Sequence, residues 1–289
     1  MKLPFVKLHG CGNDFVLVDG GAHPRDAQRR ATWSELARAA SDRRRGVGAD
    51  GLLVALPPSA PASADARMAM FNPDGSEAEM CGNGLRCLGK FLFDRGRVGR
   101  EFQVETRAGV VPVRVERLDA SGRAAELSLL LGVPDFSRAS VPMAGPPDVP
   151  ALDEPFELRG RTLRVSALSL GNPHCVTFVD DVERFPVHEV GPVLESDPRF
   201  PRRVNVEFVQ IVGRDELAQR TWERGAGETQ ACGSGATAAA VIARKVRGLG
   251  PELKVRLRGG ELRVQWAGDG EPARLFGPAV EVFEGALDA

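Results

Sequence analysis

The hydrophobic and polar positions of the chain fall into many short apolar or alternating runs, separated by Gly, Pro, Asp and Ser. Runs of about four to eight residues with this spacing are typical of β-strands. Strands are predicted at 5–9, 15–19, 52–56, 67–71, 102–106, 110–118, 125–131, 163–170, 174–179, 204–212, 253–257, 261–266, 273–276 and 279–283. The pattern therefore predicts a protein with many short strands and few helices.

Three helices are expected between these strands. Ala236 to Ala243 is a run of small and apolar residues without a polar face, and no breaker follows it until Gly248. A helix that is apolar on all sides is a buried helix. A second buried helix is expected over 85–94. The capping-box pattern that begins at Thr32 predicts a third helix, running to about Arg44.

Each buried helix is preceded by a glycine-rich turn that contains a cysteine. The turn Cys81-Gly-Asn-Gly84 corresponds to Cys232-Gly-Ser-Gly235, and a glutamate stands four residues before each cysteine. Further upstream, Gly-Asn pairs ending at Asn13 and Asn172 each precede a strand-like segment. The chain therefore reads as one α/β unit that is duplicated, which predicts two related domains.

The position of these cysteines suggests chemistry. Unpaired N–H groups and the helix dipole favour negative charge at a helix N-terminus, so the thiol of Cys232 is expected to ionise below its ordinary pKa of about 8.5. If the duplicated domains face each other, two thiols would flank one carbon atom next to a bound anion. That arrangement would suit inversion of a carbon α to a carboxylate. The alternatives are that both cysteines are core packing residues, or that they form a structural disulfide.

Composition narrows the classes of function. The chain of 289 residues has 38 Lys and Arg against 39 Asp and Glu, which argues against general affinity for nucleic acid or anionic membranes. Five cysteines, an odd number in a long chain, fit a reducing cytoplasm rather than a disulfide framework. Neither the four histidines nor the cysteines have metal-ligand spacing, and there is no lysine signature for pyridoxal phosphate. No metal and no cofactor are expected.

Six segments together resemble the diaminopimelate epimerase family of cofactor-independent isomerases, which act in lysine and peptidoglycan precursor synthesis. They are HGCGNDFVLVD (9–19), RGVGADGLL (45–53), FNPDGSEAEMCGNG (71–84), SLGNPHCVTFVDD (169–181), RVNVEF (203–208) and ERGAGETQACGSGA (223–236). The resemblance implies an α/β (α+β) fold of two pseudo-symmetric domains, each a mixed β-sheet wrapped around a central helix. The expected domains are 1–127, completed by a C-terminal strand at 275–289, and 128–274.

The resemblance also implies a role for particular residues. Cys81 and Cys232 would be the acid/base pair, and His174 and Glu223 would tune the pKa values of their thiols. Backbone N–H groups of Gly82, Asn83, Gly233 and Ser234 would hold the reacting carboxylate of the substrate. The remaining polar groups of the substrate would be bound by Asn13, Asn72, Asn172, Asn205 and Arg224, with Glu223 on the distal ammonium.

Two departures from the family and two rival functions belong to this prediction. Gly51 stands where some members have Gln. Phe283 stands near the place of a tyrosine that lies at the dimer contact of some members. The resemblance implies a homodimer, and the absence of this tyrosine leaves its strength open.

The nearest rival is a proline racemase or hydroxyproline epimerase of the same fold, against which Glu223 and Arg224 argue. The other rival is a thiol–disulfide redox protein, although the chain has no C-x-x-C motif.

Overall fold

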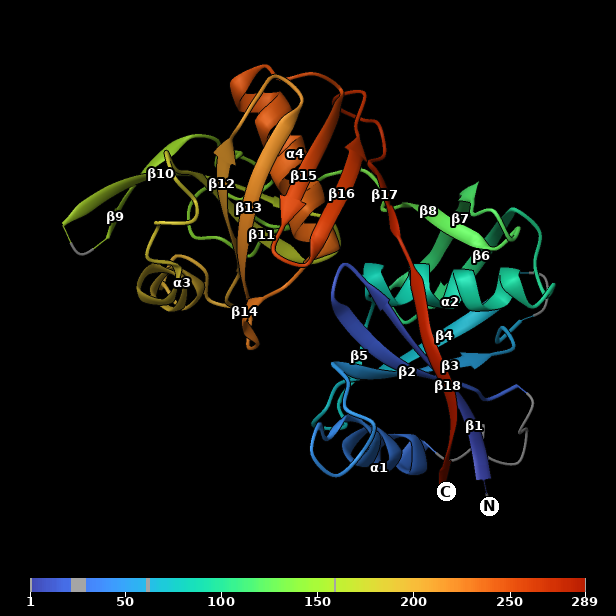
Figure 1. Cartoon of the computed structure of the whole chain (residues 1–289). Helices are drawn as coiled ribbons and strands as arrows, with labels where there is room; N and C mark the ends of the chain where they lie inside the picture. Colours follow the sequence, from blue (N-terminus) through green and yellow to red (C-terminus); the bar gives the residue numbers. More distant parts are fainter. Residues whose placement is uncertain (1, 22–29, 61–62, 159, 289) are drawn as a thin grey trace. The chain divides into compact units, whose positions relative to one another are not determined.

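The chain folds as two compact units. The computed structural model describes residues 2–288 apart from 22–29, 61–62 and 159. Unit 1 consists of Met1–Leu129 with Phe276–Ala289, and unit 2 consists of Leu130–Leu275. The domain limits expected from the sequence lie within a few residues of these positions. Figure 1 labels the helices and strands of both units.

Unit 1 contains two helices and nine strands among its described residues. They are β1 (Lys2–Gly10), β2 (Asn13–Asp19), α1 (Arg30–Ser41), β3 (Gly51–Leu56), β4 (Ala66–Phe71), β5 (Glu77–Ala78), α2 (Gly82–Asp94), β6 (Glu101–Thr106), β7 (Gly109–Leu118), β8 (Ala124–Leu130) and β18 (Val280–Asp288).

Unit 2 repeats this order, except that its strand β9 (Glu154–Leu158) comes first whereas the corresponding strand of unit 1, β18, comes last. Its other elements are β10 (Arg161–Ser169), β11 (Pro173–Phe178), α3 (Val187–Glu195), β12 (Asn205–Ile211), β13 (Glu216–Glu223), β14 (Gly227–Thr229), α4 (Gly233–Arg247), β15 (Glu252–Leu257), β16 (Gly260–Gln265) and β17 (Arg274–Pro278), which runs across the unit boundary.

Strand pairing repeats between the units as well. In unit 1, β1–β2, β3–β4, β4–β5 and β6–β7 are antiparallel, whereas β2–β3 and β4–β6 are parallel. In unit 2, β10–β11, β12–β13, β13–β14 and β15–β16 are antiparallel, whereas β11–β12 and β13–β15 are parallel. The predicted duplication is therefore confirmed at the level of sheet topology.

The register of the pairs shows which residues are equivalent. Phe71 pairs with Glu77 as Trp222 pairs with Glu228, so the segments that lead into the two cysteines match residue for residue. Working outward, Leu52 pairs with Phe71 as Val206 pairs with Trp222. Phe15 pairs with Gly51 as His174 pairs with Asn205. His174 in unit 2 thus takes the place of Phe15 in unit 1, and Glu207 takes the place of Leu53.

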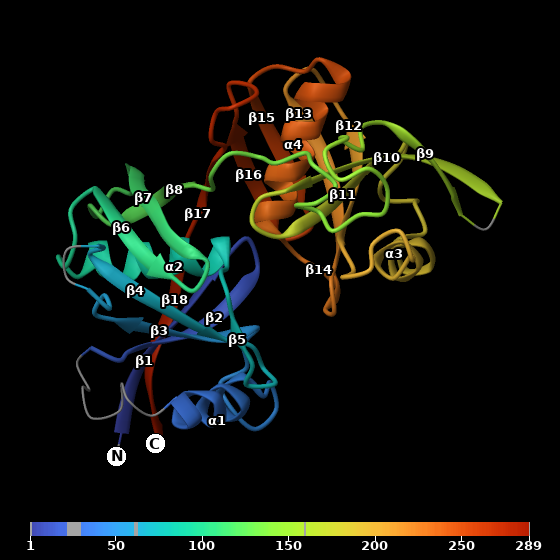
Figure 2. The ribbon, with the colours of Figure 1, turned by 180° about the vertical axis from the view of Figure 1, so that it is seen from behind.

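A buried helix lies at the centre of each unit. Helix α2 contacts β1, β2, β3, β4, β7 and β18, and α4 contacts β10, β11, β12, β13, β15 and β16. Figures 1 and 2 show each helix lying against the strands of its own unit. Every residue from Ala236 to Ala243 is buried, as predicted, and α4 ends at Gly248, which adopts a left-handed conformation with φ of 70°. The small side chains of α4 let the strands approach its backbone from several directions.

The outer helices cover a second apolar core in each unit. Helix α1 brings Trp33, Ala37 and Ala40 to a buried cluster with residues of β2 and β3, and α3 brings Val187, Val190 and Leu194 to the corresponding cluster of unit 2. Each unit therefore has an apolar layer on both sides of its strands. Within the part of the chain that the structure describes, every helix is too short or too polar to cross a membrane.

The last strand completes unit 1. Strand β18 pairs antiparallel with β1 from Lys2↔Asp288 to His9↔Val280. Strand β9 does the same for β10 in unit 2, from Arg161↔Leu158 to Val165↔Glu154. In unit 1 the partner of β1 is therefore β18, from the C-terminal part of the sequence. In unit 2 the partner of β10 is β9, the first strand of that unit.

The expected start and end of the first helix were both wrong. Helix α1 begins at Arg30 and ends at Ser41, so Thr32 lies inside it rather than at its cap, and the helix stops before Arg44. The carboxylate of Asp42 accepts the backbone N–H groups of Arg44 at 2.7 Å and Arg45 at 2.9 Å, which replaces the helical hydrogen bonds by a turn. The prediction from the sequence also missed β5, β9, α3, β13 and β14. Buried polar side chains interrupt the apolar pattern of β13.

Candidate active site

Both predicted cysteine turns are helix N-termini, with the cysteine as the N-cap residue. Cys81 has extended backbone angles and its Sγ accepts the N–H of Gly84 at 3.4 Å. Cys232 is extended as well and its Sγ accepts the N–H of Gly235 at 3.3 Å. Sulfur thus occupies the position where a serine or aspartate oxygen usually caps a helix. An ionised thiol would gain from the donated N–H and from the helix dipole.

Gly235 is needed because its surroundings leave no room for a side chain. A Cβ at this position would lie 2.7 Å from Oε1 of Glu207 and 3.2 Å from Sγ of Cys232. The corresponding contact of Gly84 in unit 1 is with a methyl group of Leu53 at 3.0 Å. The carboxylate of Glu207 and the sulfur of Cys232 are therefore near the same face of one glycine.

Replacing Gly235 by alanine should destabilise unit 2, because Glu207 is held by His174 and cannot move aside freely. Overpacking of this kind costs about 1–3 kcal/mol, partly offset by the better helix propensity of alanine. Thermal unfolding of Gly235→Ala compared with Gly99→Ala is the measurement, since nothing lies within 4 Å of a Cβ at Gly99. Equal melting temperatures for the two variants would show that the carboxylate is free to move.

The polar residues around Cys81, which form the first half-site, include three of the predicted residues: Cys81, Asn13 and Asn83. The thiol of Cys81 donates to Oδ1 of Asn13 at 3.9 Å, and Nδ2 of Asn83 donates to the same oxygen at 3.0 Å. Asn13 in turn donates to Asp50 at 2.8 Å, and Asn83 accepts from Nη2 of Arg86 at 2.6 Å. Both asparagine side chains are therefore fixed by a second layer of charged residues.

Arg86, which was not predicted as a site residue, is fully buried. Its guanidinium also donates to the carbonyl groups of Gly82 at 3.4 Å and Pro278 at 3.2 Å. Burial lowers the pKa of Arg86, while nearby cysteines oppose that shift. Asn72, also predicted for the substrate, lies in the turn between β4 and β5 and donates to Oγ of Ser76 at 3.0 Å.

The polar residues around Cys232 form the second half-site, in which a continuous chain of polar contacts runs from Cys232 to Glu207. Sγ of Cys232 lies 3.6 Å from Oγ of Ser234, which accepts from Nδ2 of Asn172 at 3.2 Å. Oδ1 of Asn172 lies 3.0 Å from Nε2 of His174. Nδ1 of His174 lies 2.8 Å from Oε1 of Glu207. The structure thus connects three predicted residues to Cys232 and adds Glu207, which the sequence reading missed.

Of the remaining predicted residues of unit 2, Asn205 begins β12, Glu223 ends β13 and Arg224 follows it. Asn205 is buried, donates to the carbonyl of Pro173 at 3.0 Å and accepts the backbone N–H of Arg224 at 2.9 Å. Glu223 accepts from the hydroxyl of Thr229 at 2.6 Å. The guanidinium of Arg224 is exposed, and its Nη1 donates to the carbonyl of Arg202 at 3.3 Å. Gly233, like Gly82 in unit 1, is the first residue of its helix.

The expected low pKa of Cys232 is not what the structure supports. Burial raises the pKa of this thiol well above its ordinary value, and the carboxylates of Glu223 and Glu207 raise it further. The hydroxyl of Ser234 and the N–H of Gly235 act in the opposite direction and do not compensate. The pKa of Glu223 is also raised, first by burial and then by Glu207. The helix N-terminus was a correct prediction, and Glu223 was expected to tune the pKa of the thiols, but the sequence did not show that burial and Glu207 also raise the pKa of Cys232.

The other three cysteines are not N-cap residues of a described helix. Burial raises the pKa of Cys87 to about 12 and also raises the pKa values of Cys11 and Cys175. All five cysteines lie within the described residues, and none of them is in a disulfide. No group of His, Cys, Asp and Glu side chains suited to a metal ion occurs in the residues described by the structure.

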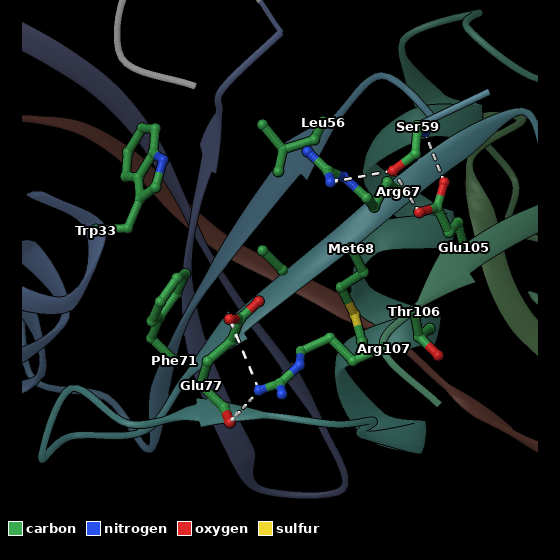
Figure 3. Close-up of a pocket in the computed structure, with 11 residues that line it drawn as sticks. Trp33, Leu56, Ser59, Arg67, Met68, Phe71, Glu77, Glu105, Thr106 and Arg107 are labelled. Atoms are coloured by element: carbon green, nitrogen blue, oxygen red, sulfur yellow. Dashed lines mark hydrogen bonds and ion pairs between the residues drawn. The ribbon is translucent and has the colours of Figure 1, made fainter. Parts of the chain in front are cut away.

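A cavity in unit 1 lies apart from these residues. It has a volume of about 240 Å³ and is lined by apolar side chains that include Trp33 and Phe71, together with Glu77 and Arg107 (Figure 3). None of the predicted site residues lines it. Nη1 of Arg107 lies 3.7 Å from a carboxylate oxygen of Glu77.

The repeat explains why this space is open. Ala69 lines the cavity, and the equivalent residue of unit 2 is Arg220. The Arg220 guanidinium fills the corresponding place: it donates to both carboxylate oxygens of Glu228 at 2.7 and 3.0 Å, and to the carbonyl groups of Val182 at 3.1 Å and Phe185 at 3.0 Å. The cavity follows from a small side chain and is not part of the half-sites.

The chain resembles known proteins in both of its units. The sequence model of the diaminopimelate epimerase family matches residues 5–125 and 166–282. The chain is 48% identical to the diaminopimelate epimerase of Moorella thermoacetica over 97% of this chain and 98% of that protein. It is 44% identical to the diaminopimelate epimerase of Stutzerimonas stutzeri over 99% of each. The chain belongs to the diaminopimelate epimerase family.

Solved structures agree on the fold. A phenazine biosynthesis protein of the PhzF family from Bacillus anthracis has a TM-score of 0.72 at 18% identity, with 100% of both chains covered. A hydroxyproline epimerase from Agrobacterium vitis has a TM-score of 0.66 at 17% identity, covering 99% of this chain and 92% of that one. At these identities the likeness shows the fold alone. The predicted fold class, with two pseudo-symmetric mixed α/β domains, is confirmed.

Proposed function

We propose that this protein interconverts LL- and meso-diaminopimelate by moving a proton at one α-carbon, within lysine and peptidoglycan precursor synthesis. Membership of the family supports the substrate. The observation that carries the mechanism is the repeated thiol-capped helix N-terminus, Cys81 on α2 and Cys232 on α4. Inversion needs one group that removes a proton from one face of the carbon and another that delivers a proton to the opposite face, and each unit offers one.

The proton balance is simple in this scheme. One cysteine starts as thiolate and breaks the Cα–H bond by taking the proton, while the other starts as thiol and forms the new Cα–H bond by giving its proton. After the reaction their protonation states are exchanged, and proton exchange with water restores the first state. The raised pKa of Cys232 supports a resting state in which this residue is the thiol.

The helix N-termini supply the second requirement. Removing a proton α to a carboxylate builds negative charge on the carboxylate oxygens. Backbone N–H groups of Gly82, Asn83, Gly233 and Ser234, all in first helical turns, are the donors proposed for that charge. A fixed set of donors of this kind stabilises the transition state more than the ground state, because the charge is larger there.

The polar residues of unit 2 favour diaminopimelate over a cyclic amino acid. Diaminopimelate has a distal ammonium and carboxylate, for which we propose Glu223 and Arg224. Glu223 lies in the half-site at the end of β13, and the exposed planar guanidinium of Arg224 suits a carboxylate. Asn13, Asn72, Asn172 and Asn205 would bind the remaining polar groups.

The assembly and location of the protein are part of the proposal. A homodimer in the cytoplasm is proposed, with β18 in the contact. Support comes from three exposed apolar side chains on this strand, Val280, Val282 and Phe283. Phe283 also packs against Phe5 with ring centroids 6.0 Å apart, so an aromatic residue is kept near the place of the tyrosine of some members.

Epimerisation of purified LL-diaminopimelate in deuterium oxide, without added cofactor, tests the function. We expect meso-diaminopimelate to form with one deuterium at the inverted α-carbon, because the delivered proton comes from a thiol equilibrated with solvent. Proline and hydroxyproline should remain optically unchanged under the same conditions. Racemisation of proline without turnover of diaminopimelate would reverse the assignment in favour of the ring substrates.

A further inference from the structure

Glu207 is a buried charged residue that the proposed mechanism has not used. It lies on β12, next to β11, and neither it nor His174 has an accessible side chain. Oε1 of Glu207 lies 2.8 Å from Nδ1 of His174, and Oε2 has no hydrogen-bond partner among the described residues. An isolated buried carboxylate is costly, so its position beside a titratable ring and below a helix N-terminus needs a reason.

The equivalent place in unit 1 is apolar. Leu53 on β3 pairs with Leu17 on β2, just as Glu207 on β12 pairs with Val176 on β11. Phe15 stands where unit 2 has His174. A methyl group of Leu53 lies below Gly84, as the carboxylate of Glu207 lies below Gly235. The fold therefore does not require charge at this position. The difference between the units lies directly behind the two capping cysteines.

The hydrogen bonds indicate the protonation state of the ring. Oδ1 of Asn172 lies 3.0 Å from Nε2 of His174, and Nδ2 of the same amide donates to Oγ of Ser234 at 3.2 Å. Both neighbours of the imidazole are thus acceptors, a carboxylate oxygen at Nδ1 and an amide oxygen at Nε2. Two acceptors beside one imidazole are both satisfied only when both ring nitrogens carry protons.

The same carboxylate is close to the sulfur of Cys232, since both lie near one face of Gly235. The charged and polar groups that face this sulfur are Glu223 from β13, Glu207 from β12 and Ser234 from α4. His174 lies further along the chain of contacts, behind Asn172. The carboxylates of Glu223 and Glu207 raise the pKa of this thiol, whereas the hydroxyl of Ser234 lowers it.

We propose that Glu207 is a positioning residue of the second half-site: it keeps both nitrogens of His174 protonated and, by its charge near Sγ, makes Cys232 hold its proton in the absence of substrate. The inference rests on the proposed function for its meaning in catalysis. It makes the two cysteines unequal, because Cys81 has Leu53 in place of this carboxylate.

The charge effect is tested by alkylation with iodoacetamide as a function of pH, following each cysteine separately by peptide mass spectrometry. In Glu207→Gln and in Glu207→Leu, Cys232 should react about tenfold faster near pH 8, because loss of a nearby charge changes the thiolate fraction by about that factor. Glu207→Leu copies unit 1. Cys81 is the internal control, and its rate should stay within about twofold, since the turn that contains it has Leu53 where the turn of Cys232 has Glu207.

Protonation of the ring is tested by nitrogen NMR of protein labelled in histidine, which is practical because the chain has only four histidines. His174 should show two protonated nitrogens at neutral pH in the wild type and one in Glu207→Leu, with the signal assigned by its loss in His174→Phe. The pH profile of kcat should also move to lower pH in Glu207→Gln. A change in folding alone would not produce that shift.

Three results would overturn the proposal: an unchanged alkylation rate of Cys232 in a folded Glu207 variant, an equal increase at Cys81, or a singly protonated His174 in the wild type. The last needs no variant, so a folding defect cannot hide it. Alkylation and NMR use no substrate, so their outcome does not depend on epimerase activity, and absence of that activity would count against the proposed function instead.

Discussion

Alanine in place of either Cys81 or Cys232 is expected to lower the rate of diaminopimelate epimerisation by at least about 10²–10⁴-fold, the usual contribution of one acid or base. The remaining cysteine can carry a proton on only one face of the carbon, so inversion cannot be completed. Steady-state turnover of LL-diaminopimelate by each purified variant is the measurement. Serine variants should be nearly as slow, because a hydroxyl is a far weaker acid than a thiol.

Cys175→Ala is the matched control for this prediction. Cys175 is also in unit 2 and is buried, with a pKa raised first by burial and then by Glu207, but it lies within β11 and caps no helix. Its replacement should leave kcat within about twofold while costing about 1 kcal/mol of stability through the small cavity it leaves. Normal turnover in Cys81→Ala or Cys232→Ala would exclude the two-base scheme.

Replacing Arg220 by methionine is expected to destabilise the protein by about 3–5 kcal/mol, the usual effect of removing one partner of a buried ion pair. The side chains of Arg220 and Glu228 are 5% and 6% exposed. Burial by itself would raise the pKa of Glu228, but Arg220, Arg258 and His188 together lower it. Without Arg220, a buried carboxylate keeps only part of its compensation. Chemical denaturation of wild type and variant gives the difference.

Two further variants separate this effect from general damage. Arg256→Met removes a pair with Glu216 whose side chains are 47% and 31% exposed, so its cost should stay below about 1 kcal/mol. The double variant Arg220→Met/Glu228→Gln removes both buried charges and should recover much of the stability lost in the single variant. If the double variant were less stable than Arg220→Met, the stranded carboxylate would not be the cause.

The sequence was most informative where structure is set locally. The turns at Cys81 and Cys232 combine glycines, a capping side chain and a following apolar run, and each of these signals depends on only a few neighbouring residues. The structure has both turns, both buried helices and the duplicated topology. The comparisons confirm the family and the fold. The roles of the individual site residues stay predictions.

The sequence was least informative where residues distant along the chain meet. The pKa of Cys232 depends on Glu207 and Glu223, which approach it only after β12 and β13 pack against α4. Glu207 has one signal that was overlooked: it is two residues after Asn205, so in a strand both side chains are on the same face. Arg86 gave no comparable signal, because a lone arginine in a helix is usually exposed.

The pairing of β18 with β1 has a consequence for the order of events during biosynthesis. A ribosome makes all of Leu130–Leu275 before it adds the strand that pairs with β1. Unit 2 can therefore reach its complete set of strand partners while unit 1 still waits with one open sheet edge. Until the last segment emerges from the exit tunnel, that edge is available to chaperones and to other nascent chains.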